Sequence, residues 1–271
     1  MSAVTHSDIA LDVNGLRLEA VEGGCVLVPS LDLQIRRGEI LGLVGESGSG
    51  KTLTCFGIAG LLPTGVRMTA GEIILDGQRI DNRSEKEWRA IRGGQIGMIF
   101  QDPLSSFNPV KTIGSILIES ARRHQNLSKA EARALAIDIL KSMHLPGSSA
   151  CVDAYPHQLS GGQRQRAMIG LALINNPALL LADEPTTALD PTVQLQILAL
   201  MRRKVSNSAG LMVTHDIAAA AAICDRLVVM LEGQIIEEGP TRTILSAPQH
   251  DFTRQLLAAA PIGTLTHGGG Q

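Results

Sequence analysis

Residues 45–52 have the sequence GESGSGKT and fit the pattern G-x-x-x-x-G-K-[ST]. The apolar stretch EILGLVG comes directly before, so we predict a buried strand that ends at the loop and a helix from about Gly50 that stops before Pro63. Glycines let backbone N–H groups wrap closely around an anion, and a helix N-terminus adds positive charge. The pattern predicts a phosphate-binding loop. The plainer alternative is a Gly-Ser connection that carries a solvated lysine.

The loop predicts a nucleotide and a magnesium ion as ligands. Lys51 can reach the β- and γ-phosphates, and the Thr52 hydroxyl can ligate Mg²⁺. The expected phosphate-binding residues are Gly45, Glu46, Ser47, Gly48, Ser49, Gly50, Lys51 and Thr52.

Two adjacent carboxylates, Asp183 and Glu184, end the apolar run in LLLADEP. Such a pair at the end of a buried strand is costly unless a cation lies nearby, and ligands gather at the carboxyl ends of parallel strands. We expect Asp183 to hold the metal through water and Glu184 to polarise the attacking water as general base. The alternative is an acidic turn before Pro185.

His215 ends another apolar run, LMVTHD. A lone histidine at a strand end is more often a structural or surface residue. Its offset from the nucleotide strand nevertheless makes it a candidate contact of the γ-phosphate, because imidazole can donate a hydrogen bond to a phosphate oxygen.

A second glycine-containing stretch, LSGGQ, occupies residues 159–163 and precedes RQRAMIGLALINNP. It resembles a phosphate cradle at a helix N-terminus, with Ser160 and the backbone of Gly161 and Gly162 as donors and Gln163 at its end. One chain therefore carries two cradles more than a hundred residues apart, and this requires an explanation.

Composition limits the function classes. The chain has 271 residues, 44% of them hydrophobic and 18% charged, with a formal net charge of −2. These values are typical of a globular protein and argue against a nucleic-acid partner, which usually leaves a basic surplus. The four cysteines are scattered, so we expect small buried apolar residues in a reduced cytosolic chain. The N-terminal residues lack the features of a secretory signal, and the apolar runs are too short to span a bilayer.

The remaining pattern alternates strands and helices. We predict short antiparallel strands with glycine-containing breaks in the first 40 residues, a hairpin in GEIILDGQRI and another that turns at Glu232-Gly233. ALLLAD and GLMVTHD predict buried strands, each followed by a helix. The fold class is therefore α/β with a mainly parallel central sheet. The last residues, THGGGQ, are expected to form a loose tail.

Residues from about 103 to 158 differ from the rest and are predicted to be mostly helical. Ser128 and Glu131 form an S-x-x-E capping box ahead of ARALAIDILKSMHL. Leu135, Ile139 and Met143 recur on one face of that helix. We expect a helical insertion into the strand-helix alternation.

These motifs resemble, in their order, the ATP-binding subunit of ABC transporters: GESGSGKT, Gln101 in MIFQDP, LSGGQ, LLLADEP, ALD at 188–190 and VTHD. The resemblance extends from about residue 8 to 260. It implies a P-loop NTPase (RecA-like) core with an N-terminal antiparallel β subdomain and an inserted α-helical subdomain. It also implies that Thr52, Gln101 and Asp183 serve Mg²⁺, that Glu184 is the general base and that His215 senses the γ-phosphate of ATP.

The resemblance also implies one domain over residues 1–271. The core and the antiparallel part would take about 8–101 and 159–250, the helical subdomain about 102–158, and a short C-terminal extension 251–271. In this family LSGGQ completes the site of a second ATPase subunit, identical or paralogous, packed head to tail, and Asp190 belongs to a loop that contacts that subunit. The other implied partners are two membrane-spanning permease subunits and a substrate-binding protein, and the implied location is the cytoplasmic face of the bacterial inner membrane.

A narrower resemblance is carried by QDPLSSFNP, YPHQLSGGQRQR, ADEPTTALDPTVQ and APQHDFTRQLLAAAP. These segments are similar to the subfamily that imports dipeptides, oligopeptides or nickel. LTCFGIAGLLPTGVRMTAGEI is similar to the first of two nickel-import ATPases, and the chain ends soon after Pro261, whereas many peptide-import relatives have a longer tail. The implied cargo is nickel or small peptides, with nickel slightly favoured.

One feature departs from the family, which usually places an aromatic residue before the phosphate loop to stack on adenine. Here the first Phe, Tyr or Trp is Phe56. Adenine must then be held by aliphatic packing, by an arginine such as Arg17, or poorly. Because stacking on an aromatic side chain contributes about 1–3 kcal/mol per base, we predict weaker adenine selectivity than is usual for the family.

Two other functions share part of the pattern. DNA-repair ATPases carry the same loop and signature, but they separate them by long coiled coils or zinc modules. Only residues 102–159 lie between Gln101 and Ser160 here, without sustained heptads or a cysteine cluster. A nucleotide kinase needs an acceptor site rather than a second glycine cradle. The motifs therefore favour the transport ATPase.

Overall fold

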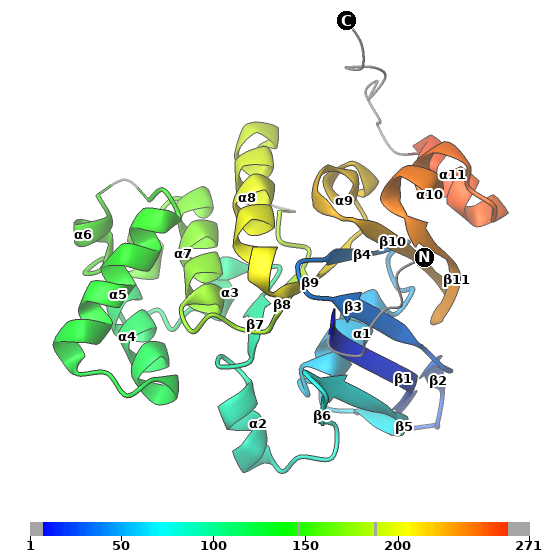
Figure 1. Cartoon of the computed structure of the whole chain (residues 1–271), viewed down its shortest axis with the longest axis horizontal. Coiled ribbons are helices and arrows are strands. Elements are labelled where there is room, and N and C mark those ends of the chain that lie inside the picture. Colours follow the sequence, from blue (N-terminus) through cyan, green and yellow to red (C-terminus); the bar gives the residue numbers. More distant parts are fainter. Residues whose placement is uncertain (1–7, 146, 187–188, 260–271) are drawn as a thin grey trace, which may run out of the picture.

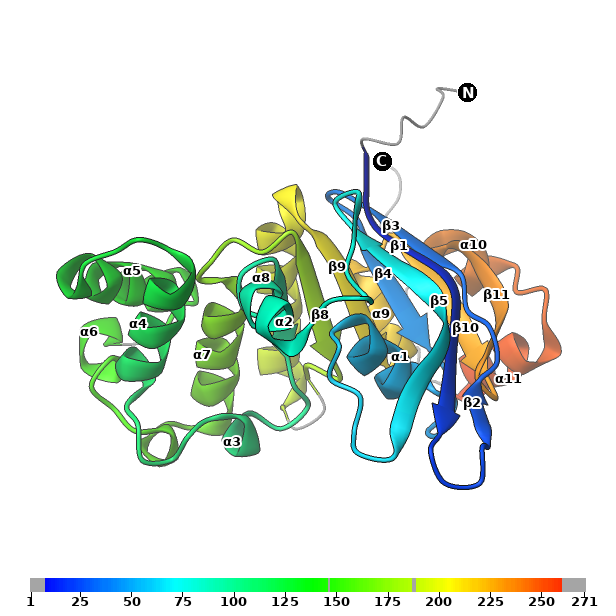
Figure 2. The same cartoon turned by 90° about the horizontal axis from the view of Figure 1, so that it is seen from below.

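The computed structural model describes residues 8–145, 147–186 and 189–259. Two sheets lie next to each other, and a group of helices extends from one end of the larger sheet (Figure 1, Figure 2). The predicted tail and Ala188 of the ALD motif lie outside the described residues.

The larger sheet has the order β11-β10-β4-β9-β8-β7, and only β11 is antiparallel to its neighbour. Every residue of β4, β8 and β9 is buried, as expected for parallel strands covered on both faces. The predicted α/β class is therefore confirmed. The strands are β4 (Ile40–Val44), β7 (Ile96–Ile99), β8 (Leu179–Asp183), β9 (Ala209–Thr214), β10 (Arg226–Leu231) and β11 (Gln234–Pro240).

The smaller sheet is antiparallel, and all of its strands lie before α2 in the chain. The glycine-containing break expected near Gly15 is instead a bulge within one long strand: Gly15 has φ +61° and the pairing register shifts between Asn14 and Arg17. The strands are β1 (Ile9–Ala20), β2 (Val26–Val28), β3 (Leu33–Arg36), β5 (Val66–Leu75) and β6 (Gln78–Arg79).

Helices cover the larger sheet and form the extension. The extension contains α3 to α6 and a short 3₁₀ turn, η2, as the pattern over 103–158 predicts (Figure 2). The helical elements are α1 (Lys51–Ile58), α2 (Glu85–Ile91), α3 (Pro103–Ser106), α4 (Ile113–His124), α5 (Lys129–Ser142), α6 (Ser148–Cys151), η2 (Pro156–Gln158), α7 (Gly161–Leu173), α8 (Pro191–Lys204), η3 (Val205–Asn207), α9 (Ile217–Ile223), α10 (Thr241–Ser246) and α11 (Asp251–Ala259). Among the described residues, no helix combines the length and the apolar character that crossing a bilayer requires.

The buried face of α5 differs from the predicted stripe. Its capping box forms and Met143, at the C-cap, is buried as expected. The helix itself buries Ala132, Ala136 and Leu140, whereas Leu135 and Ile139 are only half-buried beside them. Alanines allow close approach of neighbouring helices, so the face centres on them rather than on the larger side chains. The predicted burial of all cysteines is wrong for Cys25, which is exposed in the turn between β1 and β2.

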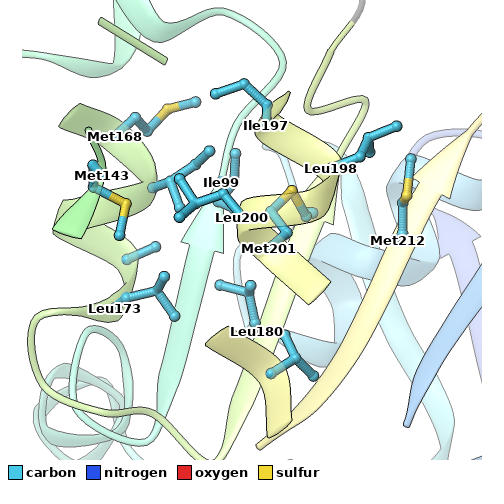
Figure 3. Packing of buried hydrophobic residues seen from close by; sticks show 14 of the residues in the cluster. Ile99, Met143, Met168, Leu173, Leu180, Ile197, Leu198, Leu200, Met201 and Met212 are labelled. Carbon is cyan, nitrogen blue, oxygen red and sulfur yellow. The ribbon is translucent and has the colours of Figure 1, made fainter. Parts of the chain in front are cut away.

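One apolar cluster joins the helical extension to the sheet. In Figure 3, Met168 and Leu173 of α7 face side chains of α8, and Leu180 of β8 and Met212 of β9 lie beyond them. All these side chains are buried. Because protein interiors are close-packed, α7 is held firmly between the extension and the sheet.

Candidate active site

The GESGSGKT loop connects β4 to α1 and needs its glycines for steric reasons. Gly45 has φ +156°, and a Cβ there would lie 2.2 Å from the carbonyl oxygen of Met230. The N–H of Gly233 donates to the Ser49 carbonyl over 3.0 Å. The predicted turn at Glu232-Gly233 therefore supports the phosphate loop from the β10–β11 hairpin.

Lys51 is only 5% exposed and lies inside this loop. Its ammonium group donates to the carbonyl oxygens of Gly45 over 2.9 Å and Glu46 over 2.7 Å, and to Ser49 Oγ over 3.3 Å. Burial lowers the pKa of Lys51, and the nearby charges of Glu184, Asp183 and Glu46 oppose this effect. The loop thus holds a desolvated cation at its centre, where a phosphate would compensate the buried charge.

A hollow of about 470 Å³ opens above the loop. It brings together Gln101, Glu184 and His215, which lie far from Lys51 along the chain and follow the ends of three different strands, β7, β8 and β9. Two aliphatic residues that the sequence analysis did not single out, Leu27 and Leu53, also line it. The remaining lining residues are Ser47, Gly48, Gly50, Lys51 and Thr52.

The Thr52 hydroxyl donates to Asp183 Oδ1 over 3.0 Å. Asp183 is 3% exposed, and burial raises the pKa of its carboxyl; the Thr52 hydrogen bond opposes this, the Glu184 charge adds to it, and Lys51 lowers it. A hydroxyl and a buried carboxylate in contact are the oxygen ligands that Mg²⁺ prefers, so the residues present fit that ion.

Glu184 is held by side chains from two other strand ends. Gln101 Nε2 donates to Glu184 Oε2 over 3.0 Å, and His215 Nδ1 lies 2.8 Å from Glu184 Oε1. The residue has φ +46°, and its N–H donates to the Val213 carbonyl over 2.8 Å. A left-handed backbone is unusual for a residue with a side chain and clusters at functional sites.

LSGGQ lies outside this hollow. Ser160 caps α7: its Oγ accepts from the Gln163 N–H over 3.3 Å, and Gln163 Oε1 accepts from the Ser160 N–H over 2.9 Å. A Cβ at Gly161 would meet nothing within 4 Å, whereas one at Gly162 would lie 3.2 Å from Val193 Cγ1. The two glycine cradles of the chain therefore do not face one site.

Gln165, on the first turns of α7, was missed by the sequence analysis. It is 2% exposed, and its Nε2 donates to the carbonyl oxygen of Pro185. The RQR segment after LSGGQ gave no sign of this contact, because a glutamine among arginines suggests a solvated helix face.

Two other expected residues have structural contacts. Asp190 is the N-cap of α8, where Oδ1 accepts from the N–H groups of Thr192 and Val193 over 3.1 Å each. Arg17, one of the options for holding adenine, donates to Glu19 and to the Pro29 carbonyl and does not line the hollow.

A family model described as ABC transporter matches residues 28–187. The chain belongs to the ABC transporter family. As a member of this family it binds ATP and is an ATP hydrolase coupled to transport, as the motifs predict.

Three relatives illustrate the match. A probable D,D-dipeptide transport ATP-binding protein of Escherichia coli K12 is 45% identical, over 93% of this chain and 78% of that protein. The oligopeptide transport ATP-binding protein OppD of Salmonella typhimurium is 42% identical, over 94% and 77%. A glutathione import ATP-binding protein of Salmonella paratyphi A is 41% identical, over 96% of this chain and 42% of that protein. The predicted resemblance to importer ATPases of this subfamily is confirmed.

Solved structures agree with this family and with the P-loop NTPase fold. A dimeric ATP-binding cassette in a post-hydrolysis state with ADP and phosphate has a TM-score of 0.75 and 28% identity, covering 86% of this chain and 99% of that one. The cassette cbiO1 of Clostridium perfringens, part of the transporter complex cbiONQ, has a TM-score of 0.74 and 27% identity, covering 89% and 92%.

Proposed function

We propose that this chain is the ATP-binding subunit of a bacterial import complex and that it drives uptake of small peptides through an inner-membrane permease. The observation that carries this proposal is the pair of contacts that bring Gln101 and His215 onto Glu184 above Lys51. A hollow with a phosphate loop, a carboxylate and two polar side chains on that carboxylate suits hydrolysis of a nucleoside triphosphate.

In this proposal Glu184 accepts the proton of the attacking water. Its side chain is 15% exposed, so it reaches solvent within the hollow while its orientation is fixed from two sides. His215 Nδ1 contacts Glu184, which leaves Nε2 of the same ring to donate to the γ-phosphate. Lys51 exchanges the loop carbonyls for β- and γ-phosphate oxygens. The chain thereby positions the base, the water and the phosphates together.

Thr52, Gln101 and Asp183 would hold Mg²⁺. The ion, when bound, neutralises charge on the phosphates. Gln101 contacts Glu184 through Nε2, so its amide oxygen is the atom available to a cation. Of the three residues, Asp183 would be stabilised most, because its buried carboxylate would then have a counter-charge.

LSGGQ would complete the ATP site of a second ATPase subunit, identical or paralogous, packed head to tail. Its place outside the chain's own hollow supports this, as does the exposure of Ser160 and Gly161. The solved relative that binds ADP and phosphate is a dimer. In this arrangement Asp190 lies in the loop that faces the second subunit.

The two permease subunits would each bind one ATPase subunit, in this chain at a hollow of about 440 Å³ between the sheet and α4. Its floor is apolar and its rim carries Arg92, Lys111, Glu119 and Arg123, which suits a short amphipathic helix. A substrate-binding protein would act through the permease, and no nucleic acid is involved. Apolar residues of the floor are Leu61, Ile96, Met98, Phe100, Ile116 and Leu171.

The proposed domain organisation follows from these roles. The chain forms one ATPase domain, with the core and antiparallel part over about 8–101 and 159–250, the helical subdomain over about 102–158 and an extension from 251 onward. The helical part carries the permease contact, and the whole subunit binds the cytoplasmic face of the inner membrane from outside the bilayer.

Peptides are the favoured cargo because the three relatives above are named for dipeptide, oligopeptide and glutathione transport. Nickel is the second candidate, and it is supported by the similarity of residues 53–73 to a nickel-import ATPase. Uptake of labelled dipeptide and of ⁶³Ni²⁺ by cells that lack this chain separates the two.

Copurification tests the transport function. The full chain, extracted in mild detergent, is expected to carry a polytopic permease identified by mass spectrometry. Ile116→Glu in the hollow's floor should release that permease, whereas Leu195→Glu, at an apolar side chain 62% exposed on α8, should not. ATP hydrolysis without any copurifying polytopic protein would contradict the transport function.

A further inference from the structure

Gln165 joins α7 to the turn that carries Glu184. Gln165 is only 2% exposed, and its side-chain Nε2 donates to the carbonyl oxygen of Pro185. Pro185 directly follows Glu184. A buried amide is costly unless it is hydrogen-bonded, so this contact fixes the distance between the helix and the turn.

The same helix begins at the LSGGQ cradle. Ser160 is the N-cap of α7, and Gln165 lies little more than one helical turn further along, about 7.5 Å by the rise of an α-helix. A hollow of about 150 Å³ is lined jointly by Gln101, Gly161, Gln165 and Pro185. Gln101 of the phosphate hollow and Gly161 of the cradle therefore both line this smaller, separate hollow.

The turn after β8 borders the phosphate hollow. Both carboxylate oxygens of Glu184 contact side chains of that hollow, and its φ of +46° is a conformation that its surroundings must maintain. Pro185 has no N–H, so its carbonyl is its only backbone hydrogen-bonding group. A change in the contacts of Gln101 or His215 acts on Glu184 and then on this carbonyl.

We propose that Gln165 is a positioning residue that couples the occupancy of the chain's own ATP site to the placement of the LSGGQ cradle that it offers to a second copy. The coupling passes from Glu184 through the Pro185 carbonyl to Gln165 and along the packed helix to Ser160. Gln165 contacts neither ATP nor the reacting atoms. This inference rests on the proposed head-to-tail pairing of two ATPase subunits.

Hydrogen exchange on single copies tests the coupling directly. ATP and Mg²⁺ are added to the full chain at concentrations where chromatography shows one copy, and exchange is followed at residues 160–165. ATP is expected to slow exchange there in the unaltered chain, and Gln165→Leu should abolish that slowing while ATP still binds.

Arg166→Leu is the matched control. Arg166 is the next residue on α7, and its guanidinium donates to the Met143 carbonyl and to Gln196 Oε1, away from Pro185. Arg166→Leu should keep the ATP-dependent slowing. The coupling role would be overturned if ATP still slowed exchange in Gln165→Leu. It would also be overturned if Arg166→Leu abolished the slowing as well.

Turnover in mixed pairs gives a second readout. A pair in which one copy carries Lys51→Ala keeps one working site, built from the other copy's Glu184 and from the LSGGQ of the Lys51→Ala copy. In pairs of otherwise unaltered chains, Gln165→Leu should lower turnover about tenfold, the size that one lost hydrogen bond produces in a rate. In the mixed pair, Gln165→Leu in the Lys51→Ala copy should have little effect, because the empty phosphate loop of that copy has no occupancy to transmit to its cradle. A tenfold loss from that copy would overturn the coupling.

Ser160→Ala distinguishes the inference from the function on which it rests. In the mixed pairs it should lower turnover only from the Lys51→Ala copy, because that copy supplies the cradle. If Ser160→Ala instead lowers turnover when it is placed in the copy with the intact phosphate loop, head-to-tail pairing is wrong, independently of the result for Gln165→Leu.

Discussion

Gln101 donates a hydrogen bond from Nε2 to Glu184 Oε2 over 3.0 Å and so connects the end of β7 to the end of β8 across the phosphate hollow. His215 contacts the other carboxylate oxygen from the end of β9 over 2.8 Å. The proposed base is thus oriented by two strand ends before a nucleotide binds. Such preorganisation fixes the direction in which Glu184 can accept a proton.

Glu184→Gln removes the base while keeping the size of the side chain. We expect ATP affinity to stay nearly unchanged and turnover to fall about 10²- to 10⁴-fold, the usual contribution of a positioned base. Equilibrium binding and phosphate release at saturating ATP measure the two quantities.

Glu232→Gln is the control, because Glu232 also has a left-handed backbone, with φ +47°, but is exposed in a hairpin turn. Normal turnover of Glu184→Gln would contradict the assignment.

Asp183→Asn is expected to stabilise the chain in the absence of Mg²⁺. Burial raises the pKa of this carboxyl above its ordinary value of 3.8. The folded state then binds the proton more tightly than the unfolded state, so stability falls as the pH rises above 3.8 and through the raised pKa. Asn cannot ionise and therefore avoids this loss of stability. Thermal unfolding at pH 7 should show a higher midpoint for Asp183→Asn, together with loss of Mg²⁺-dependent hydrolysis.

The control for Asp183→Asn is Asp138→Asn, at a side chain that is 72% exposed on α5. It should leave the unfolding midpoint almost unchanged at every pH. Equal midpoints for Asp183→Asn and the unaltered chain at pH 7 would show that the buried carboxylate is already compensated without the ion.

Gly45→Ala should disrupt the phosphate loop. The new Cβ would lie 2.2 Å from the Met230 carbonyl oxygen, so the loop or the hairpin must move, and overpacking of this kind costs about 1–3 kcal/mol. Lower stability by denaturant unfolding and weaker ATP binding are expected together. Gly23→Ala is matched in having a positive φ, +75°, but its Cβ meets nothing within 4 Å. It should leave ATP binding unchanged, and equal effects of the two variants would refute the steric argument.

The sequence predicted most of this site because its signals are local. GESGSGKT, the carboxylate pair and His215 each follow an apolar run, and parallel strands place such ends at one edge. The sequence did not reveal contacts that depend on three-dimensional packing. Gln165 and Pro185 meet across 20 residues, and Leu27 reaches the hollow from the smaller sheet; neither has a distinctive neighbourhood in the chain.

Two fold features were missed although a signal was present. Ser84 and Glu87 form the same S-x-x-E capping box as Ser128 and Glu131, and they begin α2. Strand β7 is short, but its pattern, QIGMIF, lies between the turn residues Gly93-Gly94 and Asp102-Pro103. It is nevertheless the strand that delivers Gln101 to the hollow. The predicted break near Gly15 failed because a bulge satisfies the glycine conformation without ending the strand.

Leu27 provides the aliphatic surface on which adenine is expected to rest. It lines the hollow, whereas Arg17 is engaged elsewhere. Leu27→Tyr should therefore tighten ATP binding, because an aromatic platform adds about 1–3 kcal/mol per base. ATP and GTP affinities measured side by side test this prediction.

Similar affinities for ATP and GTP are expected in the unaltered chain, and a strong preference for ATP would refute weak adenine selectivity. Val21→Tyr, at an exposed side chain in the turn between β1 and β2, is the control and should leave both affinities unchanged.

Ser160→Ala separates the two functions that one serine combines. As the N-cap of α7, Ser160 accepts a hydrogen bond from the Gln163 N–H, and loss of such a cap costs about 0.5–2 kcal/mol of stability. As a donor to a second subunit's phosphate, its loss should lower hydrolysis further while ATP binding to single copies stays nearly unchanged. Stability, single-copy binding and hydrolysis at concentrations that allow pairing measure these effects separately.

Ser128→Ala is the matched control for Ser160→Ala. Ser128 caps α5 with the same capping box, and its Oγ accepts from the Glu131 N–H over 3.2 Å, but it belongs to the helical extension and not to a glycine cradle. Both variants should lose similar stability because they lose the same kind of cap. Only Ser160→Ala should lose hydrolysis. If hydrolysis falls equally in both variants, the defect comes from helix stability, and LSGGQ has no role at a partner's phosphate.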